Sequence, residues 1–92
     1  MNELNEDPAA RARKYIANLT TALDETAIDT ENASVKATDI ARVADAIQRY
    51  LQDGRHYLDV GRATTALASV AYAEGLLDAL KFLELTQQVS SQ

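Results

Sequence analysis

The chain has 92 residues, of which 47% are hydrophobic and 25% are charged, and this balance predicts one small globular domain. Its formal net charge of −5 argues against nucleic acid and anionic membranes as partners, because both are themselves negatively charged. The lack of cysteine excludes disulfides and thiolate metal sites, and the lack of a long apolar run or a signal-like start predicts a soluble cytoplasmic protein.

A polar tail, residues 1–7, precedes the first predicted helix. Asp7 is suited to cap this helix, and Pro8 to its first position, where the missing N–H leaves no bond unmade. Apolar residues then recur at the i, i+3, i+4, i+7 spacing of one helical face. These are Ala12, Tyr15, Ile16, Leu19, Ala22 and Leu23. The pattern predicts a helix from Pro8 to about Thr26, and the polar sequence AIDTENAS that follows predicts a loop.

The second predicted helix begins at one of two caps, Ser34 or Thr38. Its apolar face comprises Ile40, Val43, Ala44, Ile47, Tyr50, Leu51, Gly54, Tyr57 and Leu58. Because this register continues through Gly54, a continuous helix is favoured over a break at the sequence QDGRH. A glycine on the apolar face also predicts that a neighbouring side chain or backbone approaches it closely. Gly61 is suited to the left-handed residue that ends a helix.

The third predicted helix runs from about Arg62 to Thr86. Its core-facing seam comprises Ala66, Val70, Ala73, Leu77, Leu80 and Glu84. The short connection at Gly61 forces the second and third helices into an antiparallel hairpin. The predicted fold is therefore all-α, a three-helix antiparallel bundle with a long hairpin between helices 2 and 3. It forms a single domain over residues 8–86, and residues 87–92 are a polar tail.

A second stripe on the third helix contains only small residues. Its members are Ala68, Ala71, Gly75 and Ala79. The favoured interpretation is structural: a neighbouring helix packs closely against the stripe, with Gly75 at the narrowest point. The alternative interpretation is a groove for a small ligand, with the small residues as its floor.

The ligand groove of this alternative would have tyrosine walls and two carboxylates. Its candidate residues are Tyr50, Tyr57, Tyr72, Glu74, Gly75 and Asp78. If Glu74 and Asp78 face the groove, they would bind a cationic or hydroxylated group of the ligand. On the exposed side of the helix instead, Asp78 would be free to pair with Lys81.

A metal site and a catalytic site are both disfavoured by the sequence. The spacing Asp53-x-x-His56 is similar to the carboxylate–histidine pairs of di-metal helical bundles. Glu74 and Asp78 on the third helix would be needed to complete such a site. The predicted hairpin register, however, separates Asp53 from Glu74 by about 9 Å along the helix axis, which is too far for the two to share a metal. His56 is the only histidine, and the sequence contains no phosphate-binding loop and no nucleophile elbow. We therefore expect no metal, no cofactor and no enzymatic activity.

Residues 50–85 carry a pattern similar to that of a known family. Its shared residues are Tyr50, Asp53, Tyr57, Leu58, Gly61, Ala66, Leu67, Tyr72, Ala73, Glu74, Gly75, Asp78 and Ala79, and SVAYAEGLLDAL is its most specific segment. The pattern resembles an archaeal family named domain of unknown function 357. The resemblance implies a small all-helical protein with no assigned activity. Family members often have an acidic residue after the turn glycine, whereas this chain has Arg62, so we expect the third helix to lack a side-chain cap.

The expected function is a non-enzymatic interaction or scaffolding module that binds a protein partner or a second copy of itself. Its candidate interface consists of strongly hydrophobic residues off the core seam. These are Leu76, Phe82, Leu83 and Leu85. The alternative is an accessory domain that binds a nucleotide or a related metabolite in the tyrosine-walled groove.

Overall fold

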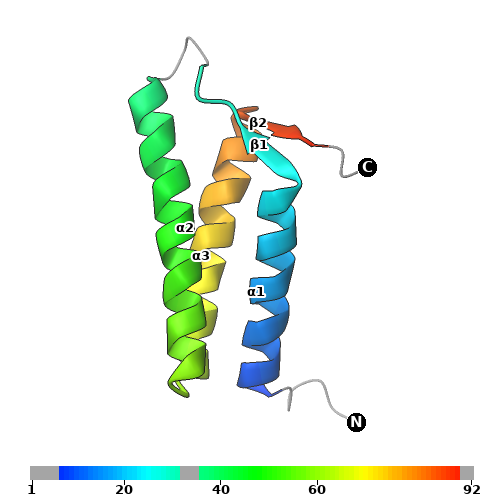
Figure 1. The fold of residues 1–92 in the computed structure, drawn as a ribbon, viewed down its shortest axis with the longest axis vertical. Helices are drawn as coiled ribbons and strands as arrows, with labels where there is room; N and C mark the ends of the chain where they lie inside the picture. The colour runs from blue at the N-terminus through cyan, green and yellow to red at the C-terminus, as the bar shows by residue number, and fades with distance from the viewer. Residues whose placement is uncertain (1–6, 32–35, 90–92) are drawn as a thin grey trace.

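Three helices account for most of the chain that the computed structural model describes, which is residues 7–31 and 36–89. They are α1 (Pro8–Asp24), α2 (Ala37–Asp59) and α3 (Ala63–Phe82). α1 and α3 run in the same direction, and α2 runs antiparallel to both (Figure 1). α2 and α3 pair along their length as an antiparallel hairpin. The predicted all-α bundle is confirmed.

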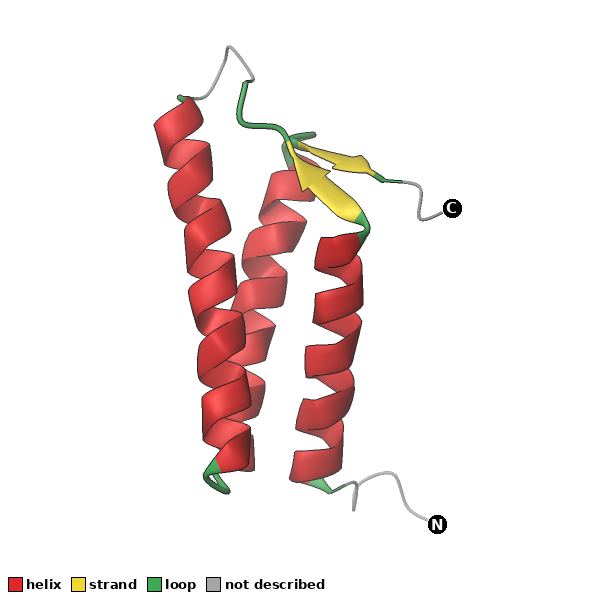
Figure 2. Ribbon diagram, in the orientation of Figure 1, coloured by secondary structure: helices red, strands yellow, loops and turns green. Residues whose placement is uncertain are grey.

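A two-stranded antiparallel sheet closes the end of the bundle opposite the α2–α3 turn (Figure 2). Strand β1 (Thr26–Ile28) pairs with β2 (Thr86–Gln88), and Thr26 lies opposite Gln88. This sheet was not predicted. Residues 27 and 28, expected in a loop, belong to β1, and residues 87 and 88, expected in a polar tail, belong to β2. Three-residue strands are too short to produce a recognisable alternation of apolar and polar residues.

α1 begins as predicted and ends two residues early. The backbone N–H of Ala9 donates to the Asp7 carboxylate at a distance of 3.1 Å, and Pro8 occupies the first turn. The helix ends at Asp24 rather than near Thr26 because the chain then enters β1. The rest of the predicted N-terminal tail, residues 1–6, lies outside the described residues.

α2 begins at Ala37, with Lys36 as an N-cap residue that makes no side-chain capping hydrogen bond. Of the two predicted caps, Thr38 is wrong because it lies inside the helix, and Ser34 lies outside the described residues. The helix continues through Gly54, so the predicted continuity is confirmed. The predicted close approach is confirmed as well: a Cβ at Gly54 would lie 2.5 Å from Val70 Cγ2.

The α2–α3 turn is a Schellman motif built on Gly61, whose φ of 81° is in the left-handed region. The N–H of Arg62 donates to the Tyr57 carbonyl (2.8 Å), and the N–H of Gly61 donates to the Leu58 carbonyl (3.1 Å). Arg62 is the N-cap residue of α3 and makes no capping bond through its side chain. Its guanidinium lies 5.3 Å from the centre of the Tyr57 ring, a cation–π contact.

A second Schellman motif ends α3 at Phe82, four residues before the predicted end. The N–H of Leu85 donates to the Leu80 carbonyl, and the N–H of Glu84 donates to the Lys81 carbonyl, each at a distance of 2.9 Å. Glu84 takes the left-handed conformation, with φ at 59°. Two predictions are wrong as a result. Glu84 is exposed rather than on the core seam, and Leu85 is 1% exposed rather than part of an interface.

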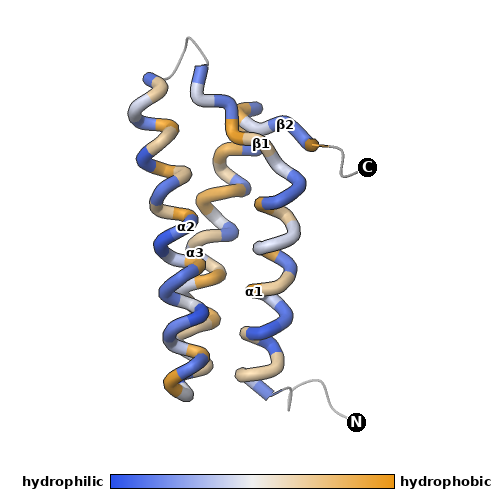
Figure 3. The backbone as a smooth tube through the Cα atoms, viewed as in Figure 1, coloured by the Kyte–Doolittle hydropathy of each residue, from blue (hydrophilic) through white to orange (hydrophobic). Residues whose placement is uncertain are grey.

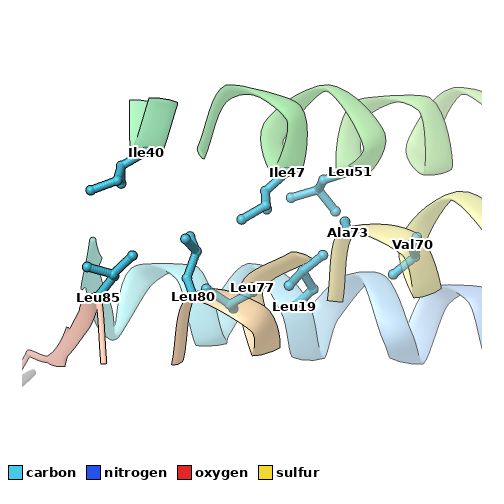
Figure 4. Packing of buried hydrophobic residues seen from close by; sticks show 9 residues of the cluster. All are labelled: Leu19, Ile40, Ile47, Leu51, Val70, Ala73, Leu77, Leu80 and Leu85. Carbon is cyan, nitrogen blue, oxygen red and sulfur yellow. The ribbon is translucent and has the colours of Figure 1, made fainter. Parts of the chain in front are cut away.

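The core is a single cluster between the three helices (Figure 4). It comprises Leu19, Ile40, Ile47, Leu51, Val70, Ala73, Leu77, Leu80 and Leu85. α3 contributes more of these side chains than either of the other helices, because it packs against both α1 and α2. Apart from Glu84, every residue of the seam predicted for the third helix is buried.

Candidate functional site

The side of α3 that points away from the core is apolar, and no other described element of the chain covers it. We call this surface the outer face of α3; it comprises Ala68, Ala71, Tyr72, Gly75, Ala79, Phe82 and the helix C-cap Leu83. All seven residues are exposed. Phe82 is 84% exposed, Leu83 62% and Tyr72 55%. A contiguous apolar surface of this kind is typical of an interaction site.

No charged residue interrupts the outer face. α3 contains three charged residues, Glu74, Asp78 and Lys81, and all three line a groove between α3 and α1. The outer face itself carries no ionised group, and Asp78, a helical neighbour of Gly75 and Phe82, borders it on the α1 side. Burying an unpaired charge costs several kcal/mol, so this arrangement favours association.

α3 differs from the other two helices in the distribution of its apolar residues. α1 and α2 concentrate them on the side that faces the core, whereas α3 is apolar around most of its circumference (Figure 3). A helix of that kind is normally buried on all sides. Here one side is covered by α1 and α2, and the outer face is not.

The predicted role of the small residues is wrong. Gly75 was expected at the narrowest point of a helix–helix contact, but a Cβ built there would meet nothing within 4 Å. The reason is rotational: α1 and α2 pack on the side of α3 that carries Val70 and Leu77, and Gly75 lies on the opposite side. Its small-residue neighbours are exposed too.

The six residues of the predicted ligand groove do not come together. Tyr50 and Tyr72 do meet, with ring centres 4.5 Å apart at an interplanar angle of 72°. They line an open groove between α2 and α3 of about 570 Å³, together with Leu76 of the predicted interface. Tyr57 lies two turns away along α2, where it packs on the ring of His56 and on Arg62.

The two carboxylates lie on the other side of α3. Glu74 and Asp78 line the separate α1–α3 groove of about 300 Å³. Partial burial raises the pKa of the Glu74 carboxyl, and the nearby Asp78 carboxylate raises this pKa further. Asp78 and Lys81 are both in the described part of the chain, and they form no ion pair with each other.

The charged rim of the α2–α3 groove is paired within α2. Arg49 Nε lies 3.2 Å from the Asp45 carboxylate, and an Arg42 amino nitrogen lies 3.9 Å from the Asp39 carboxylate. Across residues 7–31 and 36–89, no three of the His, Asp and Glu side chains gather closely enough to hold a metal ion. In the same ranges, no helix is both long and apolar enough to cross a membrane.

The comparison with known families decides the relationship of the chain. The sequence model of a family described as "Protein of unknown function (DUF357)" matches residues 14–86. The chain belongs to the DUF357 family. The match begins in the middle of α1 and reaches the first residue of β2, so the whole outer face lies within the DUF357 domain. No curated protein and no solved structure matches the chain.

Proposed function

We propose that this DUF357 protein is a non-enzymatic interaction module of the cytoplasm and that the outer face of α3 is its binding surface. One observation carries the proposal: Phe82, 84% exposed, stands on a helix face that is apolar and free of charge. Aromatic side chains are enriched at the energetic centres of interfaces, and the burial of one Phe side chain stabilises a complex by about 1.5–3 kcal/mol.

The shape of the outer face favours a helical partner. Ala71, Gly75 and Ala79 follow one another at intervals of four residues, so their small side chains lie in a row along the helix. Small residues let the backbone of a second helix come close, which increases the number of van der Waals contacts. Phe82 and Tyr72, both exposed aromatic residues, border this row.

A small-ligand domain is the second candidate, and the observation that favours it is the α2–α3 groove. Its volume of about 570 Å³ suits a nucleotide or a metabolite of similar size, and Tyr50 and Tyr72 line it. This candidate predicts that such a ligand raises the melting temperature and that Tyr72→Ala removes the rise. A panel of nucleotides that leaves the melting temperature unchanged argues against it.

Photo-crosslinking in the cells of origin tests the interaction module. A benzophenone amino acid replaces Phe82 in the full chain, and a control chain carries it in place of Ala41, which is exposed on α2. We expect a specific covalent adduct from position 82 and none from position 41. If position 82 gives no adduct above the control, the outer face has no partner in the cell and the proposal is wrong.

A further inference from the structure

We infer that the partner of the outer face is a second copy of this chain, with the two α3 helices antiparallel and crossing at Gly75. The inference rests on the proposed function and names the partner. It follows from how residues are arranged on either side of Gly75, from the sizes of their side chains and from the position of the charges.

Four residues of the outer face lie at equal distances before and after Gly75. Ala71 and Ala79 lie four residues before and after it, and Ala68 and Phe82 lie seven residues before and after it. With 3.6 residues per turn, steps of four and seven residues both return to the same side of the helix. A two-fold axis through Gly75 therefore places Ala71 opposite the partner's Ala79, and Phe82 opposite the partner's Ala68.

The sizes of these residues are complementary in the antiparallel arrangement. At the crossing point the two glycines present no Cβ, and the space around Gly75 is open. Two turns away, about 10.5 Å along the axis, the large Phe82 ring meets an alanine, and the same contact occurs again at the other end. A parallel pair would set Phe82 against the partner's Phe82 and leave a gap between the two Ala68 residues. Antiparallel helix dipoles also attract each other.

The charges permit this contact despite the net charge of −5, which opposes self-association. Glu74 and Lys81 lie toward α1, and Asp78 borders the outer face on its α1 side, so the crossing leaves the charged side chains of α3 at or beyond its edge. The pairing is a self-complementary interface of the kind that a two-fold symmetric dimer requires.

The area available predicts a reversible dimer rather than a permanent one. The stretch from Ala68 to Phe82 is about 21 Å long on a helix about 10 Å wide. A complete aromatic side chain buries about 150–250 Å². The two Phe82 and two Tyr72 side chains of a dimer therefore supply several hundred Å² of its buried surface. A total on the order of 1,000 Å² is close to the lower limit for specific interfaces, so we expect a dissociation constant on the order of micromolar.

Disulfide trapping tests both the partner and the orientation. The natural chain has no cysteine, so Ala71→Cys and Ala79→Cys each introduce a single thiol while Phe82 and Gly75 stay in place. The two purified variants are mixed in equal amounts under mild oxidation, and peptide mass spectrometry identifies each disulfide. Because a disulfide requires Cα atoms within about 7 Å, positions eight residues apart along the helix are distinguished. Ala41→Cys is the control for random collision.

We expect the mixed 71–79 disulfide to predominate, and we expect its loss when Phe82→Glu is added to both variants. Phe82 is so exposed that this change leaves the monomer folded, which circular dichroism verifies. Predominant 71–71 and 79–79 disulfides would overturn the antiparallel arrangement. Disulfides no more abundant than in the Ala41→Cys control would overturn self-association. The cellular crosslink at position 82 then distinguishes the proposed interaction function from the inferred dimer. An adduct with a different protein supports the interaction function, and no adduct rejects the interaction function and the dimer together.

Discussion

Replacement of Gly54 by alanine tests how α2 packs on α3. The added Cβ would lie 2.5 Å from Val70 Cγ2, whereas carbon atoms in favourable contact are about 3.5–4.0 Å apart. Val70 is fully buried, and its β-branched side chain has one strongly preferred rotamer in a helix. The methyl group cannot turn aside, so one helix must move away from the other.

Two opposing effects set the free energy of unfolding of the Gly54→Ala variant. Alanine favours the helix by about 1 kcal/mol over glycine, and overpacking of a core costs about 1–3 kcal/mol. We therefore expect a loss of up to about 2 kcal/mol. Gly75→Ala is the matched control, because it gains the same helix propensity and meets nothing within 4 Å. It is expected to be more stable than the natural chain by about 1 kcal/mol.

Urea unfolding followed by circular dichroism measures both variants, at a concentration low enough for the chain to be monomeric. The helix-propensity gain cancels between them, so their difference of about 1–3 kcal/mol is the steric cost. Val70→Ala removes the clashing methyl, and its cost should be smaller in the Gly54→Ala chain than in the natural chain. Equal stability of the two glycine variants, or equal cost of Val70→Ala in both backgrounds, would refute the packing described for α2 and α3.

Three further predictions concern a turn, a cap and a carboxyl group. Glu84→Gly relieves the left-handed backbone and should raise the free energy of unfolding by about 0.5–1 kcal/mol, whereas Glu84→Ala keeps the strain and should give no gain in urea unfolding. Lys36→Ser supplies the acceptor that the N-cap of α2 lacks, so thermal unfolding should show a gain of about 1 kcal/mol over Lys36→Ala. The raised pKa of Glu74 means that the folded chain holds this proton more tightly than the unfolded chain, so its contribution to stability is present below the ordinary pKa of Glu and is lost as pH rises through the raised pKa. Relative to the natural chain, Glu74→Gln should gain stability as pH rises through that range; a constant difference between the two from pH 4 to pH 7 contradicts the burial of this carboxyl.

Sequence periodicity was sufficient to predict the helices and their pairing. The apolar register of α2 continues through Gly54 without a shift, and that alone distinguished a continuous helix from a broken one. Gly61 was recognisable because the left-handed conformation that ends a helix is one that glycine adopts without strain. These features depend on neighbours along the chain, which the sequence displays directly.

The second end of α3 was not predictable by the same reasoning. Its Schellman motif uses Glu84 where glycine is the usual residue, so the sequence carried no stop signal. The turn sends Leu85 back into the core, and the pairing of β1 with β2 joins segments about 60 residues apart. Both depend on tertiary contacts rather than on local preference.

The candidate site was predicted in its composition and misplaced in its geometry. Spacing alone placed Gly75 and its small neighbours on one side of α3. It did not show which side of the helix faces the core. It also grouped Tyr72 with Glu74, although residues two apart on a helix point in different directions. In the structure Tyr72 borders α2 and Glu74 borders α1.

Sedimentation equilibrium of the purified chain tests the interaction surface most directly, over protein concentrations from about 1 μM to about 1 mM. We expect a reversible monomer–dimer equilibrium for the natural chain and for Ala41→Glu, and a monomer for Gly75→Glu. Gly75→Glu adds a charged side chain in open space, which leaves the monomer intact and blocks the crossing of two α3 helices. Self-association through the outer face is refuted by a natural chain that stays monomeric throughout this range, or by a Gly75→Glu variant that dimerises as readily as the natural chain.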